Sequence, residues 1–146
     1  MTTILVTGSR YYQGDVKEYC DALENMRTNL SLDPNITLIH GGAQGADVIT
    51  AAEGNKRGWL VEEYLPLWSK CGKAAGPVRN GVLVSKRPHL ALALLLSDSV
   101  GTRDCLKQLA RSTKSDKSRL QHTLLVDLEN LQSRWLDPLQ LLEEFG

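Results

Sequence analysis

The stretch that decides the fold is Ile36-Thr37-Leu38-Ile39-His40-Gly41-Gly42-Ala43-Gln44-Gly45-Ala46-Asp47. Its first five residues form a short β-branched and apolar run, which predicts a strand. A glycine-rich turn follows directly at residues 41–45. The alanine-rich segment 46–56 then predicts a helix, which Gly58 ends. The sequence therefore places a strand, a tight turn and a helix in immediate succession.

The same alternation continues on both sides of this stretch. Strands are predicted at residues 3–7, 36–40, 60–65, 90–97 and 122–127. Helices are predicted over residues 16–30 and 46–56, after a loop at 66–75 with Pro77 in the first helical turn, from Gly101-Thr102, and in a tail at about 129–146 where Asp137-Pro138 starts a helix by capping. Such alternation predicts a single Rossmann-like α/β domain over residues 1–146, in three layers around a mainly parallel five-stranded sheet.

The composition limits the classes of partner. Lys+Arg and Asp+Glu balance at 17 each, which argues against a protein whose main work is coating nucleic acid or an anionic membrane. The apolar run at 90–96 is too short to span a bilayer. Three cysteines without metal-ligand spacing favour a reduced compartment and no metal or cofactor. With no leader at its amino terminus, the protein is expected in the cytoplasm.

Parallel sheets of this kind bind ligands beyond the carboxyl ends of their strands. Two glycine turns stand there, each before a helix whose free N–H groups favour an anion. Their candidate residues for binding a phosphate-bearing ligand are Gly8, Ser9, Arg10, Gly41, Gly42, Ala43, Gly45 and Asp47. The alternative for each turn is a purely structural role, but two turns at adjacent strand ends favour a site.

A third candidate segment lies at residues 72–80 and contains Lys73, Arg79 and Asn80, the last two expected in the first turn of a helix. Arg79 is suited to bidentate recognition of phosphate. Trp68 is a candidate for stacking on a base, although packing on the sheet is the favoured interpretation. The GxGxxG and GxxxxGK[ST] motifs are both absent, and His40 stands where a dinucleotide site has an acid, which argues against hydride transfer and P-loop NTPase chemistry.

Taken together, the segments at residues 7–10, 40–47 and 68–80 resemble the YspA-like branch of the SLOG superfamily. That superfamily also contains the LOG-type cytokinin-activating phosphoribohydrolases and the DNA-processing protein DprA. The resemblance covers residues 3–110. It implies a Rossmann-like fold and ligands related to nucleotides or ADP-ribose.

The turn after the fourth strand departs from that resemblance. The superfamily often has a PGGxGT turn there, followed by an acid that is catalytic in the phosphoribohydrolases. Gly101 and Thr102 match this pattern and Asp104 stands at the position of the acid, whereas Asp98 and Ser99 replace the paired glycines. Asp98 would repel a phosphate but could accept protons from ribose hydroxyls.

Three functions follow from these residues. The leading hypothesis is a binding protein that senses or scavenges a nucleotide-type small molecule. The alternative is a hydrolase of N-glycosidic bonds in nucleotides, with Asp104 acting on the sugar and Arg79 holding the phosphate. The third is a DNA-processing accessory protein, which the balanced charge and few aromatic residues disfavour. The apolar tail is expected to pack on its own sheet or to form a homo-oligomer through the C-terminal helices.

Overall fold

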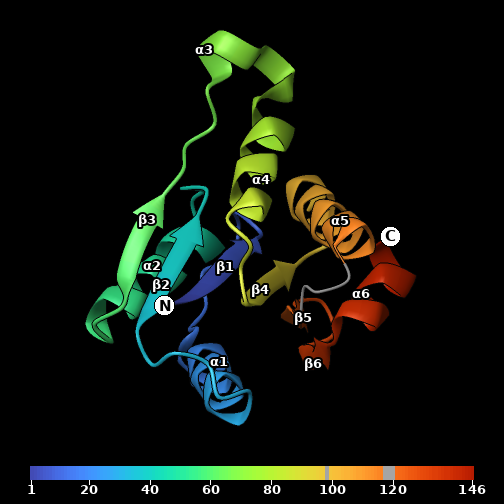
Figure 1. Ribbon diagram of the computed structural model, residues 1–146. Helices are drawn as coiled ribbons and strands as arrows, with labels where there is room; N and C mark the ends of the chain where they lie inside the picture. Colours follow the sequence, from blue (N-terminus) through green and yellow to red (C-terminus); the bar gives the residue numbers. More distant parts are fainter. Residues whose placement is uncertain (98, 117–120) are drawn as a thin grey trace.

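The computed structural model describes residues 1–97, 99–116 and 121–146. Within these residues, six strands form one open sheet in the order β3-β2-β1-β4-β5-β6 (Figure 1). The strands are β1 (Thr2–Gly8), β2 (Ile36–His40), β3 (Leu60–Glu63), β4 (Leu90–Leu95), β5 (His122–Asp127) and β6 (Gln132–Leu136). The first five are parallel and β6 is antiparallel to β5. The predicted fold class, a mainly parallel Rossmann-like sheet, is confirmed.

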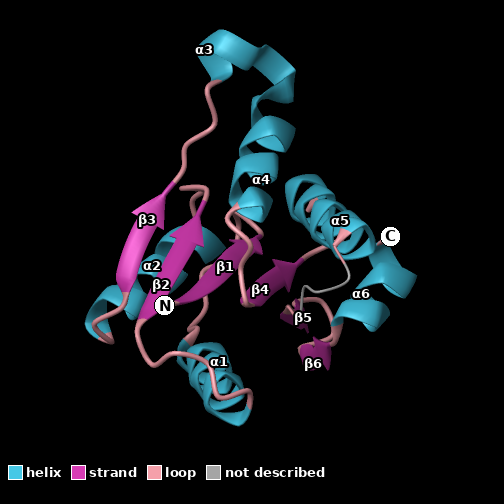
Figure 2. Ribbon diagram, in the orientation of Figure 1, coloured by secondary structure: helices cyan, strands magenta, loops and turns pink. Residues whose placement is uncertain are grey.

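Helices cover both faces of this sheet (Figure 2). They are α1 (Lys17–Asn29), α2 (Ala46–Lys56), α3 (Trp68–Cys71), α4 (Ala75–Ser85), α5 (Val100–Ser115) and α6 (Pro138–Phe145). Ile4 and Val6 of β1 lie in the core beneath α1 and α2, whereas Leu5 lies in the core beneath α4, α5 and α6. Side chains on a strand alternate between faces, so both faces of β1 are buried. Among the described residues, no helix is both long and apolar enough to cross a membrane.

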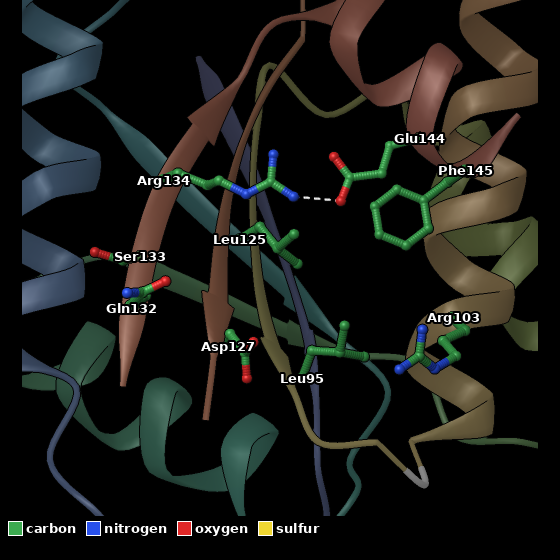
Figure 3. Close-up of a pocket in the computed structure, with 9 residues that line it drawn as sticks. All are labelled: Leu95, Arg103, Leu125, Asp127, Gln132, Ser133, Arg134, Glu144 and Phe145. Atoms are coloured by element: carbon green, nitrogen blue, oxygen red, sulfur yellow. Dashed lines mark hydrogen bonds and ion pairs between the residues drawn. The ribbon is translucent and has the colours of Figure 1, made fainter. Parts of the chain in front are cut away.

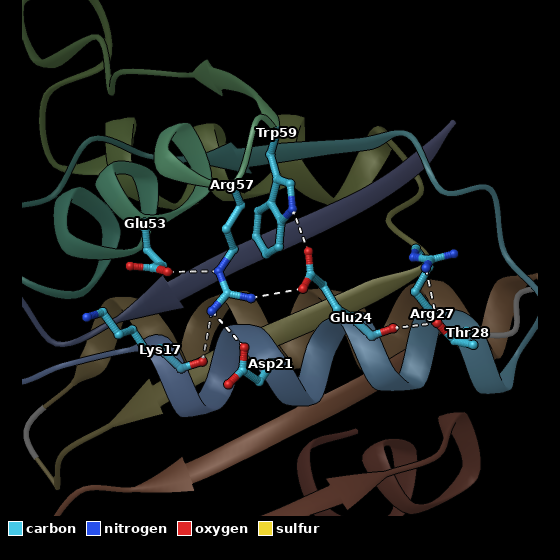
Figure 4. A network of polar contacts seen from close by, with 8 residues as sticks. All are labelled: Lys17, Asp21, Glu24, Arg27, Thr28, Glu53, Arg57 and Trp59. Atoms are coloured by element: carbon cyan, nitrogen blue, oxygen red, sulfur yellow. Dashed lines mark hydrogen bonds and ion pairs between the residues drawn. The ribbon is translucent and has the colours of Figure 1, made fainter.

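A polar network fastens α1 to α2 on the first face (Figure 4). The guanidinium of Arg57, just after α2, donates to Asp21 and Glu24 of α1 at 2.8 and 2.9 Å and to Glu53 of α2 at 2.8 Å. The indole Nε1 of Trp59 donates to the second oxygen of Glu24 at 3.2 Å. Three carboxylates thus surround one arginine, and the two helices are held together.

The tail differs from the prediction, because β6 occupies part of the segment at 129–146 that was expected to be helical. Asp127 accepts hydrogen bonds from the N–H groups of Glu129 and Asn130 and starts a tight turn. Leu131 adopts a left-handed φ of 54° and completes the reversal. The free edge of β5 then pairs with the returning chain, a non-local interaction that the local sequence pattern does not contain. The helix start at Asp137-Pro138 is confirmed by a complete capping box.

The segment before α4 also differs. Residues 66–75 were expected to be a loop, yet they contain α3 and a 3₁₀ turn (Gly72–Ala74), and α4 begins at Ala75 with Pro77 in its first turn, as expected. Pro77 is tolerated because the N–H groups of a first helical turn have no partner within the helix. Arg79 and Asn80 therefore lie in the second turn. Figure 1 shows α3 and the start of α4 extending beyond the strand ends.

Candidate ligand-binding site

A cleft of about 400 Å³ opens at the carboxyl ends of β1 and β4. From β1 the chain goes to β2 and β3 on one side, and it returns to β4 on the other, so this is the point where the strand order reverses. In parallel sheets, ligands bind at such a point. The described residues that line the cleft are Thr7, Gly8, Ser9, Arg10, Tyr11, Ala43, Asp47, Trp68, Gly76, Arg79, Asn80, Ser99, Val100, Gly101 and Thr102.

The two predicted glycine turns pack against each other beside this cleft. A Cβ on Gly8 would lie 2.7 Å from the Cβ of Ala46, and one on Gly45 would lie 2.6 Å from the carbonyl oxygen of Arg10. Ala46 N–H, in the first turn of α2, donates to the carbonyl oxygen of Ser9 at 3.1 Å. Close approach of the two backbones therefore accounts for both glycines. It also uses one of the helix N–H groups that were expected to face the ligand.

Arg79 comes from α4 but reaches the end of β2. Its Nη1 donates to the carbonyl oxygen of Gly41 at 2.6 Å, and its Nε donates to the side-chain oxygen of Asn80 at 3.1 Å. A Cβ on Gly41 would lie 1.9 Å from Nη1, so only glycine leaves room for the guanidinium. Within the described part of the chain, no ion pair joins Arg79 to a carboxylate. The charge of Arg79 is half-buried.

Asp47 is the one described carboxyl group that lines the cleft. Its Oδ2 accepts the N–H groups of Gly41 and Ala43 at 3.1 and 3.3 Å and so fixes the second glycine turn. Its Oδ1 is buried and has no hydrogen-bond partner among the described residues. Burial raises the pKa of this carboxyl to about 6, against the opposing effects of the two N–H groups and of Arg79.

Asn80 connects α4 to the start of α5. Its buried amide nitrogen donates to the carbonyl oxygen of Gly101 at 3.2 Å and to Oδ2 of Asp104 at 2.9 Å. Gln108 donates to the same oxygen of Asp104 at 2.9 Å. Asp104 lies in the second turn of α5 and is not among the residues lining the cleft. Asp104 therefore contacts Asn80 from outside the cleft.

The N-terminus of α5 opens into the cleft through Ser99, Val100, Gly101 and Thr102. No side chain caps this helix among the described residues. The hydroxyl of Ser99 accepts the N–H of Leu96 at 3.1 Å instead of an N–H of the helix. The first-turn N–H groups of a helix have no partner within the helix and carry partial positive charge. They are therefore open to an anion.

The predicted site residues thus separate into three groups. Nine line the cleft: Gly8, Ser9, Arg10, Ala43, Asp47, Arg79, Asn80, Gly101 and Thr102. Five do not line it: Gly41, Gly42, Gly45, Lys73 and Asp104. Asp98 lies outside the described residues.

Two aromatic residues that line the cleft were not among the predicted site residues. Tyr11 was not considered, although it directly follows Arg10. Trp68 was expected to pack on the sheet, and this was wrong, because its side chain is 60% exposed on α3. His40 is buried, and its Nδ1 accepts the N–H of Gly42 at 3.0 Å.

A larger hollow of about 570 Å³ lies between α5, α6 and the edge of the sheet at β5 and β6 (Figure 3). Here Arg134 pairs with Glu144, and Asp127 accepts two N–H groups of the β5–β6 turn and the side-chain amide of Asn130. Arg103 also lines the hollow and makes no ion pair among the described residues. None of the predicted site residues lines it. In the described part of the chain, no group of three His, Cys, Asp or Glu side chains is arranged to hold a metal ion. The cleft is therefore the candidate site.

Comparison with known proteins gives a family match in the amino-terminal half of the chain. A sequence model of the "YspA, cpYpsA-related SLOG family" matches residues 2–70, which include both glycine turns and Trp68. Over 118 residues, the chain is 35% identical to the "Gene 61 protein" of Mycobacterium phage D29, a match that covers 77% of this chain and 91% of that protein. No solved structure matches the chain.

Proposed function

The chain belongs to the YspA, cpYpsA-related SLOG family, and from that premise we propose that it binds a nucleotide or a nucleotide derivative, such as ADP-ribose, in the cleft between β1 and β4. Membership of this family suggests nucleotide-related binding or processing. The finer proposal is that the protein senses or scavenges its ligand. The ligand would lie against Ser9, Asp47, Arg79 and the first turn of α5.

One observation carries this proposal: among the described residues, the cleft combines an arginine that makes no ion pair and a helix N-terminus that no side chain caps. Both are arrangements that bind phosphate, the first through charge-assisted hydrogen bonds and the second through free N–H groups and the helix dipole. Among the described residues, neither is neutralised within the protein. A phosphate group of the ligand would supply the missing charge to both.

Asp47 would contact a different part of the ligand. Its unpartnered oxygen is buried, and a buried acceptor without a donor is costly. Since a carboxylate repels phosphate, the donor that would fit this oxygen, were a ligand to reach it, is a hydroxyl group. A ribose supplies such hydroxyls. Arg79 and Asp47 together therefore favour a ligand that carries both a phosphate and a sugar.

A second candidate function is hydrolysis of an N-glycosidic bond. The cleft favours Asp47 as the acting carboxyl group, in place of Asp104, which was expected from the sequence. Asp104 is engaged by Asn80 and Gln108 and does not line the cleft. Asp47 does line it, and its pKa of about 6 lies near that of an effective general acid or base. In this alternative, Asp47 would stabilise a cationic sugar or activate water.

The binding proposal is tested by measuring thermal unfolding with AMP, ADP-ribose, NAD and inorganic phosphate. A ligand that binds only the folded state raises Tm. We expect Arg79→Ala to weaken binding of the best ligand by about 1.5–3 kcal/mol, because a charge-assisted bond is lost. Arg111→Ala is the matched control, since it removes the same charge from the exposed face of α5. If no ligand raises Tm, or if both variants lose affinity equally, the proposal is wrong.

Turnover separates the two candidate functions. Wild-type protein is incubated with AMP, GMP, CMP and NAD, and free base is measured by chromatography. The binder predicts no release of base by the wild type alongside a clear rise in Tm. Release that disappears in Asp47→Asn but persists in Asp104→Asn would establish the hydrolase with Asp47 as its acid. Release that disappears only in Asp104→Asn would restore the mechanism expected from the sequence.

A further inference from the structure

The exposed aromatic residues of this protein gather at one place. The chain contains three Trp, four Tyr and one Phe, all of them among the described residues. Only Tyr11 and Trp68 are exposed, at 64% and 60%. Both line the candidate cleft, although Tyr11 follows β1 and Trp68 begins α3. Large aromatic side chains left open to water at the same cleft are typical of a ligand site.

Local contacts hold each ring at the cleft. The backbone N–H of Tyr11 donates to the hydroxyl of Ser9 at 3.1 Å, and the guanidinium of Arg10 lies 5.3 Å from the centre of the Tyr11 ring. The far edge of the Trp68 indole lies 3.9 Å from the position where Gly76 would carry a Cβ. A Cβ at position 76 would make an ordinary van der Waals contact with the indole, which therefore lies beside the first turn of α4. The cleft accommodates the two rings without burying them in the core.

The amide side chain of the cleft is engaged within the protein and is not free to read the edge of a base. The side chains that usually do so with an amide are Asn and Gln, and Asn80 is the only amide side chain among the described residues lining the cleft. Its nitrogen donates to Gly101 and Asp104, and its oxygen accepts from Arg79. Aromatic rings, in contrast, bind any base through its flat face.

We propose that Tyr11 and Trp68 bind the base of the nucleotide by stacking, so that the site selects purine nucleotides by ring size and not by the pattern of groups on the base. This inference rests on the proposed function, in which Arg79 and α5 hold the phosphate. It assigns the two exposed aromatic residues to the opposite end of the ligand. Adenine and guanine nucleotides bind with similar affinity, and cytosine nucleotides bind more weakly because their ring is smaller.

The test compares AMP, GMP, CMP and ribose 5-phosphate by calorimetric titration, and ADP-ribose by quenching of tryptophan fluorescence. Ribose 5-phosphate retains the sugar and the phosphate but lacks the base. We expect AMP and GMP to bind at least fivefold more tightly than ribose 5-phosphate. The affinity for CMP should lie between that for the two purine nucleotides and that for ribose 5-phosphate. In Trp68→Leu that advantage falls below twofold while the affinity for ribose 5-phosphate is unchanged. Trp68→Phe retains most of it, because a ring remains, but loses the fluorescence quenching by ADP-ribose.

Leu67→Ala is the matched control, because Leu67 precedes Trp68, is 58% exposed and lines a neighbouring apolar groove instead of the cleft. It should change no affinity. The stacking inference alone is overturned if wild type binds AMP and ribose 5-phosphate equally, or if Trp68→Leu weakens both by the same factor. If wild type binds none of the five compounds, the proposed function fails, and the stacking inference fails with it.

Discussion

Arginine and tryptophan occur together in two regions of this molecule, and the two regions use them differently. Between α1 and α2, Arg57 is surrounded by Asp21, Glu24 and Glu53, and Trp59 is buried beside it (Figure 4). At the cleft, Arg79 has no ion pair among the described residues and Trp68 is exposed. The same residue types are fully satisfied in one region and open in the other.

The contrast separates residues that stabilise the fold from residues that are available to a ligand. A charge that is neutralised within the protein has little left to offer a ligand, whereas a charge without a partner binds one with less competition. Burial follows the same division, since Trp59 is 7% exposed and Trp68 is 60% exposed. Substitutions in the Arg57 region should therefore change stability, and substitutions at the cleft should change binding. Four measurements test this division.

The largest effect is expected for Arg57→Ala, which should lower the free energy of unfolding by about 3 kcal/mol. The substitution leaves the nearly buried carboxylate of Glu53 without its partner, and breaking a buried pair costs about 3–5 kcal/mol, reduced here by the exposure of Asp21 and Glu24. Urea unfolding of variant and wild type measures it. A loss below about 1 kcal/mol would show that water replaces the network, and the division would not hold.

The second effect depends on pH and concerns Asp47. Burial raises the pKa of its carboxyl to about 6 in the folded protein, from an ordinary value of 3.8. The folded state therefore holds a proton that the unfolded state releases between these values, so this group's contribution to stability is complete below pH 4 and is lost as the pH rises through 6. Asp47→Asn carries no charge at any pH.

The free energy of unfolding of Asp47→Asn, relative to wild type, should accordingly rise by about 2 kcal/mol between pH 4 and pH 7. Urea unfolding of both proteins at four pH values measures this difference, and effects of other titrating groups cancel. A difference that is flat with pH would mean that Asp47 is charged at both ends of the range. The carboxyl would then be as well satisfied as those around Arg57.

The third measurement compares the two tryptophans by the same substitution. Trp59→Phe should cost about 1–2 kcal/mol, because it removes the hydrogen bond to Glu24 and leaves a gap in the core. Trp68→Phe should change stability by less than about 0.5 kcal/mol, as expected for an exposed side chain. Thermal unfolding of both variants without ligand provides the comparison. Equal losses would indicate that Trp68 is a packing residue after all.

A similarly small effect, about 0.5 kcal/mol, is expected for Arg79→Ala without ligand. Its hydrogen bonds to Gly41 and to the side chain of Asn80 are lost, but no carboxylate is left without a partner in the described part of the chain. Arg111→Ala again serves as the control. A loss as large as that of Arg57→Ala would show that Arg79 is mainly structural. Its role in binding would then have to be separated from folding.

Much of the fold was predictable because each buried strand is marked by an apolar run in its own segment of the sequence. The apolar runs at residues 36–40 and 122–127 predicted β2 and β5 with the bounds that the structure has. The strand β6 was missed because Gln132, Ser133 and Arg134 are polar and exposed, so no apolar pattern marks the strand. Its pairing is decided by the free edge of β5. The helix α3 was missed because it is only four residues long and no hydrophobic periodicity marks so short a helix.

At the candidate site, the sequence determined the residue types, and the tertiary structure decided which of them meet. Glycines after strand ends, and Arg79 after the third strand, could be identified from the chain alone, because turn geometry and anion binding depend on residue type. Three features could not be identified in this way: the lack of an ion pair for Arg79 and of a partner for one Asp47 oxygen, both among the described residues, and the exposure of Tyr11 and Trp68. These features depend on which helices and strands pack over each side chain, and therefore on contacts between residues that are distant in the sequence.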